Sequence, residues 1–140
     1  MEVIHDWINH SFYVEEKIDN QTFRMEFENV GETLDTIYFN IAVSVYNKRK
    51  HQDANEQLIK ITGKNPMATA MMAIKAFKML EKSCNEYYNK NYNTFFYACW
   101  IDNRRRQVYE KFLTKFGYNY GSSPFGEKCL FKKYMKGEAL

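Results

Sequence analysis

The chain has few of the residues that build disulfide-rich or metal-binding proteins. Its only cysteines are Cys84, Cys99 and Cys129. An odd number at such wide spacings predicts neither a disulfide framework nor a zinc site. The three histidines show none of the metal-binding spacings such as HExxH, so we expect no metal centre. Cysteine use of this kind fits a reducing compartment, and we expect a cytoplasmic protein.

Long apolar runs and a strong net charge are also missing. No stretch of about 18 apolar residues is present, and the N-terminus lacks a basic region followed by an apolar one. We therefore expect neither a membrane span nor a secretory signal. The net charge of +3 is too small to favour nucleic acid binding. We expect the local basic clusters to be solvated surfaces: residues 48–51, residues 104–106, and Lys128, Lys132, Lys133 and Lys136.

What is present is enough apolar material for one folded domain. Hydrophobic residues make up 45% of the 140 residues and aromatic residues 17%, which suits a single domain over residues 1–140. Residues 1–10 are expected to form a short helix or an arm. Alternating or β-branched segments then predict an antiparallel meander of four strands, over residues 12–18, 22–28, 35–46 and 57–62. Gly31 is expected to break the second of these patterns, and residues 47–55 to form a loop.

The hydrophobic period changes to that of a helix at Pro66. Asn65 is a good N-cap and proline suits a first helical turn, so we expect a helix from Pro66 to about residues 84–87. A buried strand over residues 94–100 and a helix from Asp102 or Asn103 to residue 115 follow. Gly117 ends that helix, residues 119–126 read as a linker, and residues 129–134 as a last strand. The predicted class is α/β of the α+β kind, with a mixed, mainly antiparallel sheet flanked by two helices.

The turn between the strand at 57–62 and the helix predicts an anion-binding cradle. Backbone N–H groups converge where a glycine turn meets a helix N-terminus, and the helix dipole adds partial positive charge. Lys64 would add a cation, and Asn65 tolerates the backbone conformations that such a loop needs. An ordinary strand-to-helix turn is the alternative. The residues of the predicted cradle are Lys60, Ile61, Thr62, Gly63, Lys64, Asn65 and Met67.

Two motifs resemble those of the GNAT superfamily of N-acyltransferases. Residues 60–65 resemble its phosphate loop, Arg/Gln-x-x-Gly-x-Gly/Ala: Lys60 keeps a basic first residue, Gly63 is the first glycine, and Asn65 replaces the last small residue. Residues 102–118 match Asn-x-x-(Ala/Arg)-x-x-x-Tyr-x-x-x-Gly-Phe, with Asp102 at the first position, Tyr109 at the tyrosine, and about one extra helical turn before Gly117. The resemblance covers residues 57–134. It extends to compact acyltransferase-like proteins of tailed bacteriophages, which would place the protein in the host cytoplasm.

The resemblance implies a donor, a reaction and a set of site residues. Acetyl-CoA would be the co-substrate, with its pantetheine arm between the strands at 57–62 and 94–100 and its pyrophosphate on residues 63–67. An amine of a small molecule or a protein would attack the thioester, and Tyr109 would protonate the leaving thiolate. Asp102 would contact the pantetheine or cap the helix, and Tyr109 could instead serve only in packing. Cys99 reads as an inert core thiol. The general base stays open among Glu26, Glu28, Glu32 and Asp35.

Two other classes of function remain as alternatives. The first is a catalytically inactive protein of the same fold that acts as a binding or virion-associated component. The imperfect phosphate loop and the missing base favour it. The second, a nucleic acid-binding module based on residues 104–106, is the least favoured because the net charge is small. The sequence leaves a homo-oligomer open.

Overall fold

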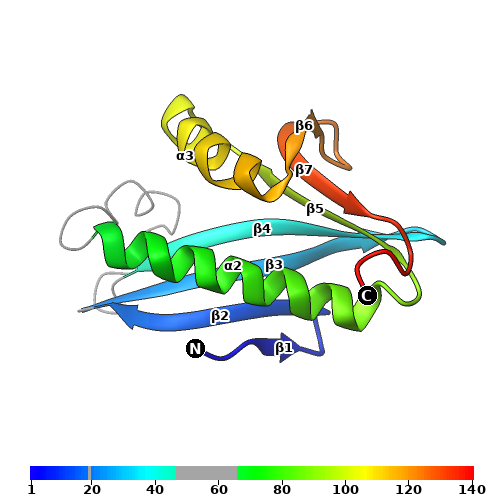
Figure 1. Cartoon of the computed structure of the whole chain (residues 1–140), viewed down its shortest axis with the longest axis horizontal. Helices are drawn as coiled ribbons and strands as arrows, with labels where there is room; N and C mark the ends of the chain where they lie inside the picture. The colour runs from blue at the N-terminus through cyan, green and yellow to red at the C-terminus, as the bar shows by residue number, and fades with distance from the viewer. Residues whose placement is uncertain (19, 47–65) are drawn as a thin grey trace.

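The computed structural model describes residues 1–18, 20–46 and 66–140 (Figure 1). The predicted loop at 47–55, the predicted strand at 57–62 and cradle residues 60–65 lie outside this part of the chain. Met67 lies in a described helix, but its side chain is outside the description. Within the described residues, one sheet of seven strands packs with two α-helices. This confirms the predicted α+β class with a mixed, mostly antiparallel sheet.

The elements follow the chain in the predicted order with two additions. The strands are β1 (Ile4–Asp6), β2 (Ser11–Ile18), β3 (Gln21–Glu32), β4 (Thr36–Tyr46), β5 (Asn93–Cys99), β6 (Asn119–Ser122) and β7 (Lys128–Tyr134). The helices are α2 (Pro66–Tyr88) and α3 (Asn103–Leu113), and the short 3-10 turn η1 (Thr114–Phe116) continues α3. The additions are β1 and β6.

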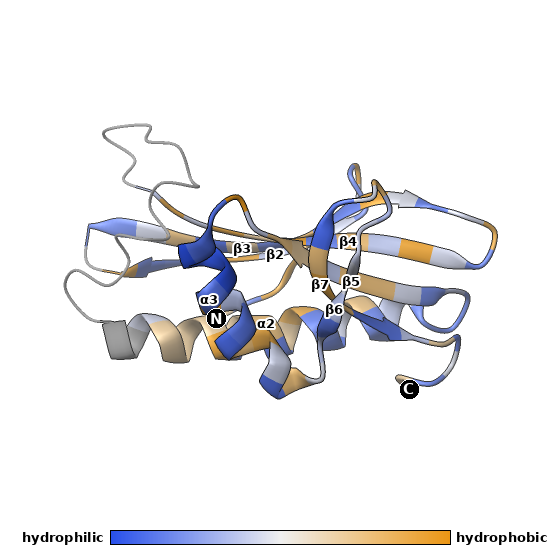
Figure 2. Cartoon of the chain, turned by 90° about the horizontal axis from the view of Figure 1, so that it is seen from above, coloured by the Kyte–Doolittle hydropathy of each residue, from blue (hydrophilic) through white to orange (hydrophobic). Residues whose placement is uncertain are grey.

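The sheet has the order β1-β2-β3-β4-β5-β7-β6. Only β4 and β5 run parallel, and every other neighbouring pair is antiparallel. A parallel pair needs a crossover connection, and α2 lies on the path from β4 to β5 (Figure 1). Both helices lie on one face of the sheet, which we call the helix face (Figure 2). No helix among the described residues covers the opposite, open face.

The core lies between the helix face and α2, and its centre is aromatic. Alternate strand residues point to this face, as the two-residue period of a strand requires. The Phe27 ring lies 5.8 Å from that of Phe77 in α2 and 5.2 Å from that of Phe96 in β5. Phe77 also contacts Phe112 of α3 at 5.5 Å. These rings therefore join the meander, both helices and β5 into one core.

Three expectations from the sequence are wrong in detail. Residues 1–10 form β1 and a turn rather than a helix, because β1 pairs with β2. The expected linker contains β6, which pairs with β7. A Cβ at Gly121 of β6 would lie 2.4 Å from the Phe131 ring, so glycine is required there within a strand. Finally, Gly31 does not end the strand as expected. Strand β3 continues through it with a register shift between Asn29 and Gly31, and the φ of Gly31 is 143°.

Replacing the central ring tests this account of the core. Phe27 is fully buried, so Phe27→Ala should lower the free energy of unfolding by about 3–5 kcal/mol through lost burial and a residual cavity. Phe125 is 67% exposed, so Phe125→Ala should change the stability by less than about 0.5 kcal/mol. Denaturant unfolding followed by circular dichroism measures both. Equal effects of the two substitutions would contradict the assignment of Phe27 to the core.

Candidate functional site

The parallel pairing of β4 with β5 stops partway along both strands. Residue pairs run from Thr36–Asn93 to Asn40–Tyr97. Beyond these, β4 continues to Tyr46 paired with β3 alone, and β5 continues to Cys99 paired with β7 alone. We call this opening the fork, made by residues 41–46 of β4 and 98–99 of β5. Each side of the fork presents a strand edge that has no partner strand among the described residues.

Strand β4 is a neighbour of β5 that the sequence did not predict. The strand at 57–62 was expected beside residues 94–100, with a donor between them. Instead, over residues 94–97 β5 pairs with β4 on one side and with β7 on the other. The sequence favours the strand at 57–62 as the neighbour of β5 because that apolar segment comes shortly before the helix at Pro66. That segment lies outside the described residues, and the described strand that pairs with β5 on this side is β4. Among the described residues, β4 is therefore the strand nearest to a ligand beside β5 at the fork.

Asp102 fixes the start of α3. Its Oδ1 accepts a hydrogen bond from the backbone N–H of Arg105 at 2.9 Å, and its φ of −143° is that of an N-cap residue. This geometry confirms the capping role that the sequence left as one of two alternatives for Asp102. The helix and η1 end at Gly117, whose φ is 85°, a conformation that favours glycine. Together these ends set which side of α3 faces the core.

Tyr109 lies on the core-facing side of α3 and is half-buried. Burial raises the pKa of its phenol; Arg105 lowers it, and Asp102 and Cys99 raise it. Its hydroxyl has no hydrogen-bond partner among the described residues. Because Cys99 is the last residue of β5, its electrostatic effect on the pKa of Tyr109 agrees with a position of Tyr109 near the fork. The structure thus holds a half-buried phenol, with no hydrogen-bond partner among the described residues, at the position that the sequence predicted to be catalytic.

Arg105 is the residue that sequence reasoning missed. All three arginines at 104–106 were expected on a solvated surface, but Arg105 is only 8% exposed. Its Nε is buried without a hydrogen-bond partner, and it forms no ion pair with a described residue. Arg104 is exposed, and Arg106 is paired with Glu110 at 3.0 Å. The sequence held one signal for this burial, the helical spacing: Arg105 precedes Tyr109 by four residues and so lies on the same side of the helix.

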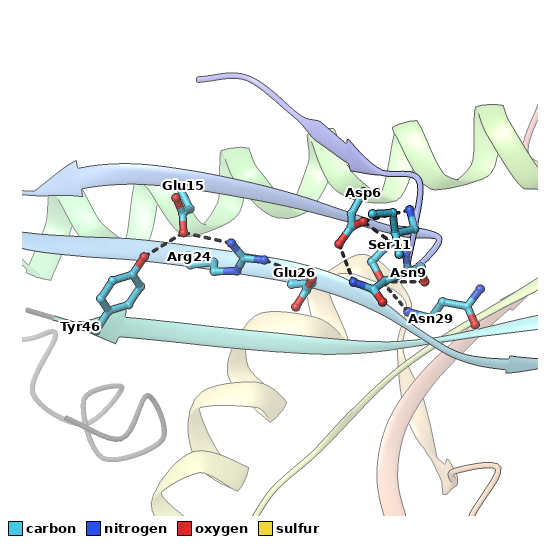
Figure 3. A network of polar contacts seen from close by, with 9 residues as sticks. Asp6, Asn9, Ser11, Glu15, Arg24, Glu26, Asn29 and Tyr46 are labelled. Carbon is cyan, nitrogen blue, oxygen red and sulfur yellow. Dashed lines mark hydrogen bonds and ion pairs between the residues drawn. The ribbon is translucent and has the colours of Figure 1, made fainter. Parts of the chain in front are cut away.

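The carboxylates considered as candidate bases differ in their ion pairs and hydrogen bonds. On the open face, Arg24 pairs with Glu15 at 3.0 Å and with Glu26 at 3.3 Å, while Tyr46 donates to Glu15 at 2.8 Å (Figure 3). The Glu26 carboxylate is therefore in an ion pair with the Arg24 guanidinium. Hydrogen bonds from the Thr36 and Thr33 hydroxyls lower the pKa of Asp35, which makes it a weaker base. Glu32 interacts with Tyr92, away from the fork.

Glu28 remains, and the register places it near the fork. It lies opposite Asn40, and Asn40 lies opposite Tyr97 in the last residue pair of β4 and β5. Directly opposed residues point to the same face, so these three side chains form a row on the open face. Burial, together with the neighbouring Cys99, Glu127 and Glu28, raises the pKa of Tyr97 to about 12. Glu28 is exposed and forms no ion pair with a described residue.

Another carboxylate, that of Glu81, takes part in a hydrogen-bond network between α2 and β7. Glu81 of α2 accepts a hydrogen bond from Tyr118 at 2.9 Å and another from Tyr134. It borders a cavity of about 300 Å³ between α2, η1 and β7. Both of its oxygens are engaged by phenols, and burial raises the pKa of Tyr118. This cluster stabilises the packing of β7 on α2 and is not a candidate base.

Comparisons with known proteins found no relative of this chain. None of the protein-family models, curated proteins or solved structures compared with it matches. No helix in the described part of the chain is long and apolar enough to cross a membrane. The same residues contain no group of three or more histidine, cysteine, aspartate or glutamate side chains that could hold a metal ion. The site is therefore defined by the fork, Tyr109, Arg105 and Glu28.

The thiols beside the site are expected to react slowly. Cys99 lies opposite Cys129 in the sheet; burial raises the pKa of Cys99, and burial raises that of Cys129 to about 12. Since the thiolate is the reactive form, no thiol of the folded protein should react with a disulfide reagent at pH 8 as fast as free cysteine. The absorbance of the thiolate that the reagent releases measures the rate of reaction. After unfolding in guanidinium, all three thiols of the protein should react. One fast thiol in the folded protein would contradict inert cysteines.

Proposed function

We propose that the protein is an acyl-CoA-dependent N-acyltransferase of the GNAT type that transfers an acyl group from a donor such as acetyl-CoA to an amine. The observation that carries this proposal is the fork beside Tyr109, whose hydroxyl has no hydrogen-bond partner among the described residues. Unpaired backbone N–H and C=O groups on a strand edge bind extended ligands by hydrogen bonding. The two amides of a pantetheine arm are suited to this edge. The thioester at the end of the arm would then lie near Tyr109.

The reaction needs a proton acceptor, a nucleophile and a proton donor. The acceptor amine attacks the thioester carbonyl carbon, an amide C–N bond forms, and the C–S bond breaks. Glu28, through a bridging water, takes the proton that the amine loses. Tyr109 gives its proton to the leaving thiolate. A tyrosine phenol is protonated at neutral pH, so Tyr109 has a proton to give, although burial raises its pKa and makes it a weaker donor.

The pyrophosphate cradle stays a prediction from the sequence. Its glycine, Gly63, precedes the first residue of α2 by three positions, and α2 is a helix of 23 residues. The N-terminus of such a helix favours an anion through its dipole and its free N–H groups. A donor that placed its phosphates there could extend its arm along β4 towards the fork. The acceptor could be a small molecule or a protein.

A non-catalytic, acyl-CoA-binding or virion-associated protein is the second candidate. One observation favours it: the proposed base lies on β3, one strand away from the fork. A base at that distance would need a bridging water. In this candidate the fork still binds the donor, but no acyl group is transferred.

Donor binding is the first test of the proposal. Coenzyme A at about 100 times its Kd should raise the free energy of unfolding by about 2.7 kcal/mol, which thermal melts detect. Gly63→Asp would place a carboxylate against the pyrophosphate and should abolish this stabilisation. Val108→Ala, a change at an exposed position of α3, is the control and should keep it. An unchanged melting temperature of the wild type with coenzyme A and acetyl-CoA would refute both candidates.

Turnover separates the two candidates and tests the two roles. Tyr109→Phe and Glu28→Gln should each keep the affinity for acetyl-CoA and lower kcat about 10²–10⁴-fold, the usual range for general acid–base groups. Tyr120→Phe and Glu26→Gln are matched controls and should leave kcat nearly unchanged. Release of free thiol during acetylation of a pool of amines is measured. Donor binding without thiol release in the wild type would favour the non-catalytic candidate.

A further inference from the structure

Arg105 is a buried cation that has no counterion among the described residues. Its side chain is more than nine-tenths buried, its Nε has no hydrogen-bond partner, and it forms no ion pair with a described residue. Burial of an unpaired charge is costly, and proteins normally pair such a group or leave it in solvent. Arg104 and Arg106 on the same helix follow that rule, because both are exposed. An anionic ligand would supply the partner that the described residues do not give Arg105.

The position of Arg105 restricts where that anion would lie. Side chains four residues apart on a helix are neighbours, with Cβ atoms about 5–6 Å apart, so Arg105 lies beside Tyr109. Its effect on the pKa of Tyr109 agrees with this placement. The proposed function puts the donor sulfur at the Tyr109 hydroxyl. The phosphates of coenzyme A are separated from that sulfur by the whole pantetheine arm. An anion at Arg105 would therefore belong to the reacting end of the ligands.

We propose that Arg105 binds a carboxylate that one of the two reactants carries next to the thioester. This inference rests on the proposed function. A guanidinium presents a planar fork of N–H donors that matches a carboxylate in two parallel hydrogen bonds. Two reactants could supply it: an acyl group derived from a dicarboxylic acid, such as succinyl, or an amino acid that acts as the acceptor amine. In both, the carboxylate lies a few bonds from the carbon under attack.

The donor arm compares the binding of coenzyme A, acetyl-CoA and succinyl-CoA by calorimetry. Arg105→Met keeps the aliphatic stem and removes the charge, and Arg104→Met is the matched exposed control. If the donor carries the carboxylate, the wild type and Arg104→Met should bind succinyl-CoA about 10–100-fold more tightly than acetyl-CoA, the range for a hydrogen bond to a charged group. Arg105→Met should lose this preference and keep its affinity for coenzyme A.

The acceptor arm uses acetyl-CoA with alanine or with ethylamine, which lacks the carboxylate. If the acceptor carries the carboxylate, the wild type and Arg104→Met should show a kcat/KM about 10–100-fold higher for alanine. Arg105→Met should lose this preference. Arg105→Lys, which keeps the charge but not the planar fork, should retain only part of it in whichever arm responds.

Several outcomes would overturn the inference. One is a wild type with no carboxylate preference in either arm. Another is an Arg105→Met protein that loses affinity for coenzyme A and both thioesters equally, which would assign Arg105 to the phosphates. A lower melting temperature of unliganded Arg105→Met would indicate a paired structural guanidinium, whereas loss of an unpaired charge should leave it equal or higher. Failure of coenzyme A and both thioesters to bind the wild type would remove the proposed function as well.

Discussion

The short parallel pairing of β4 with β5 is the constraint on which the rest of the structure depends. Five residue pairs join the N-terminal meander to the β5-β7-β6 half of the sheet. Such a pair needs a crossover, and α2 supplies it. Because backbone pairing covers only part of both strands, the packing of Phe27 on Phe77 and Phe96 must hold the two halves together. The same short pairing leaves the fork open, so stability and the candidate site have one origin.

The second determinant is the orientation of α3. The Asp102 cap begins the helix and Gly117 ends it, so the side that carries Phe112 packs on Phe77. Helical spacing then places Tyr109 and Arg105 on that side as well. Arg105 carries a charge where burial opposes one, and it partly offsets the effect of burial on the pKa of Tyr109. An apolar side chain at this position would pack at lower cost, which is why a ligand is the better explanation for an arginine there.

Local signals in the sequence predicted much of the fold and part of the site. The helix from Asp102 with its stop at Gly117, and the change of period at Pro66, are properties of single residues and their neighbours, and the structure has both helices. Pairing between distant strands is not local, so the partnership of β4 with β5 was missed. Strand β6 was hidden by Gly121, which reads as a turn residue until Phe131 packs over it. The burial of Arg105 depends on tertiary packing and was missed for the same reason.

The sheet itself separates the two proton transfers that the proposed reaction needs. Tyr109 belongs to a helix on the helix face, whereas Glu28 alternates with the buried Phe27 and so points to the open face. The fork is where β4 and β5 stop pairing, and a thioester placed there would be approached from both faces. A base on one face and an acid on the other cannot exchange protons directly through a paired sheet. Glu28 would then take only the proton that the amine loses, and Tyr109 would give only its own proton to the thiolate.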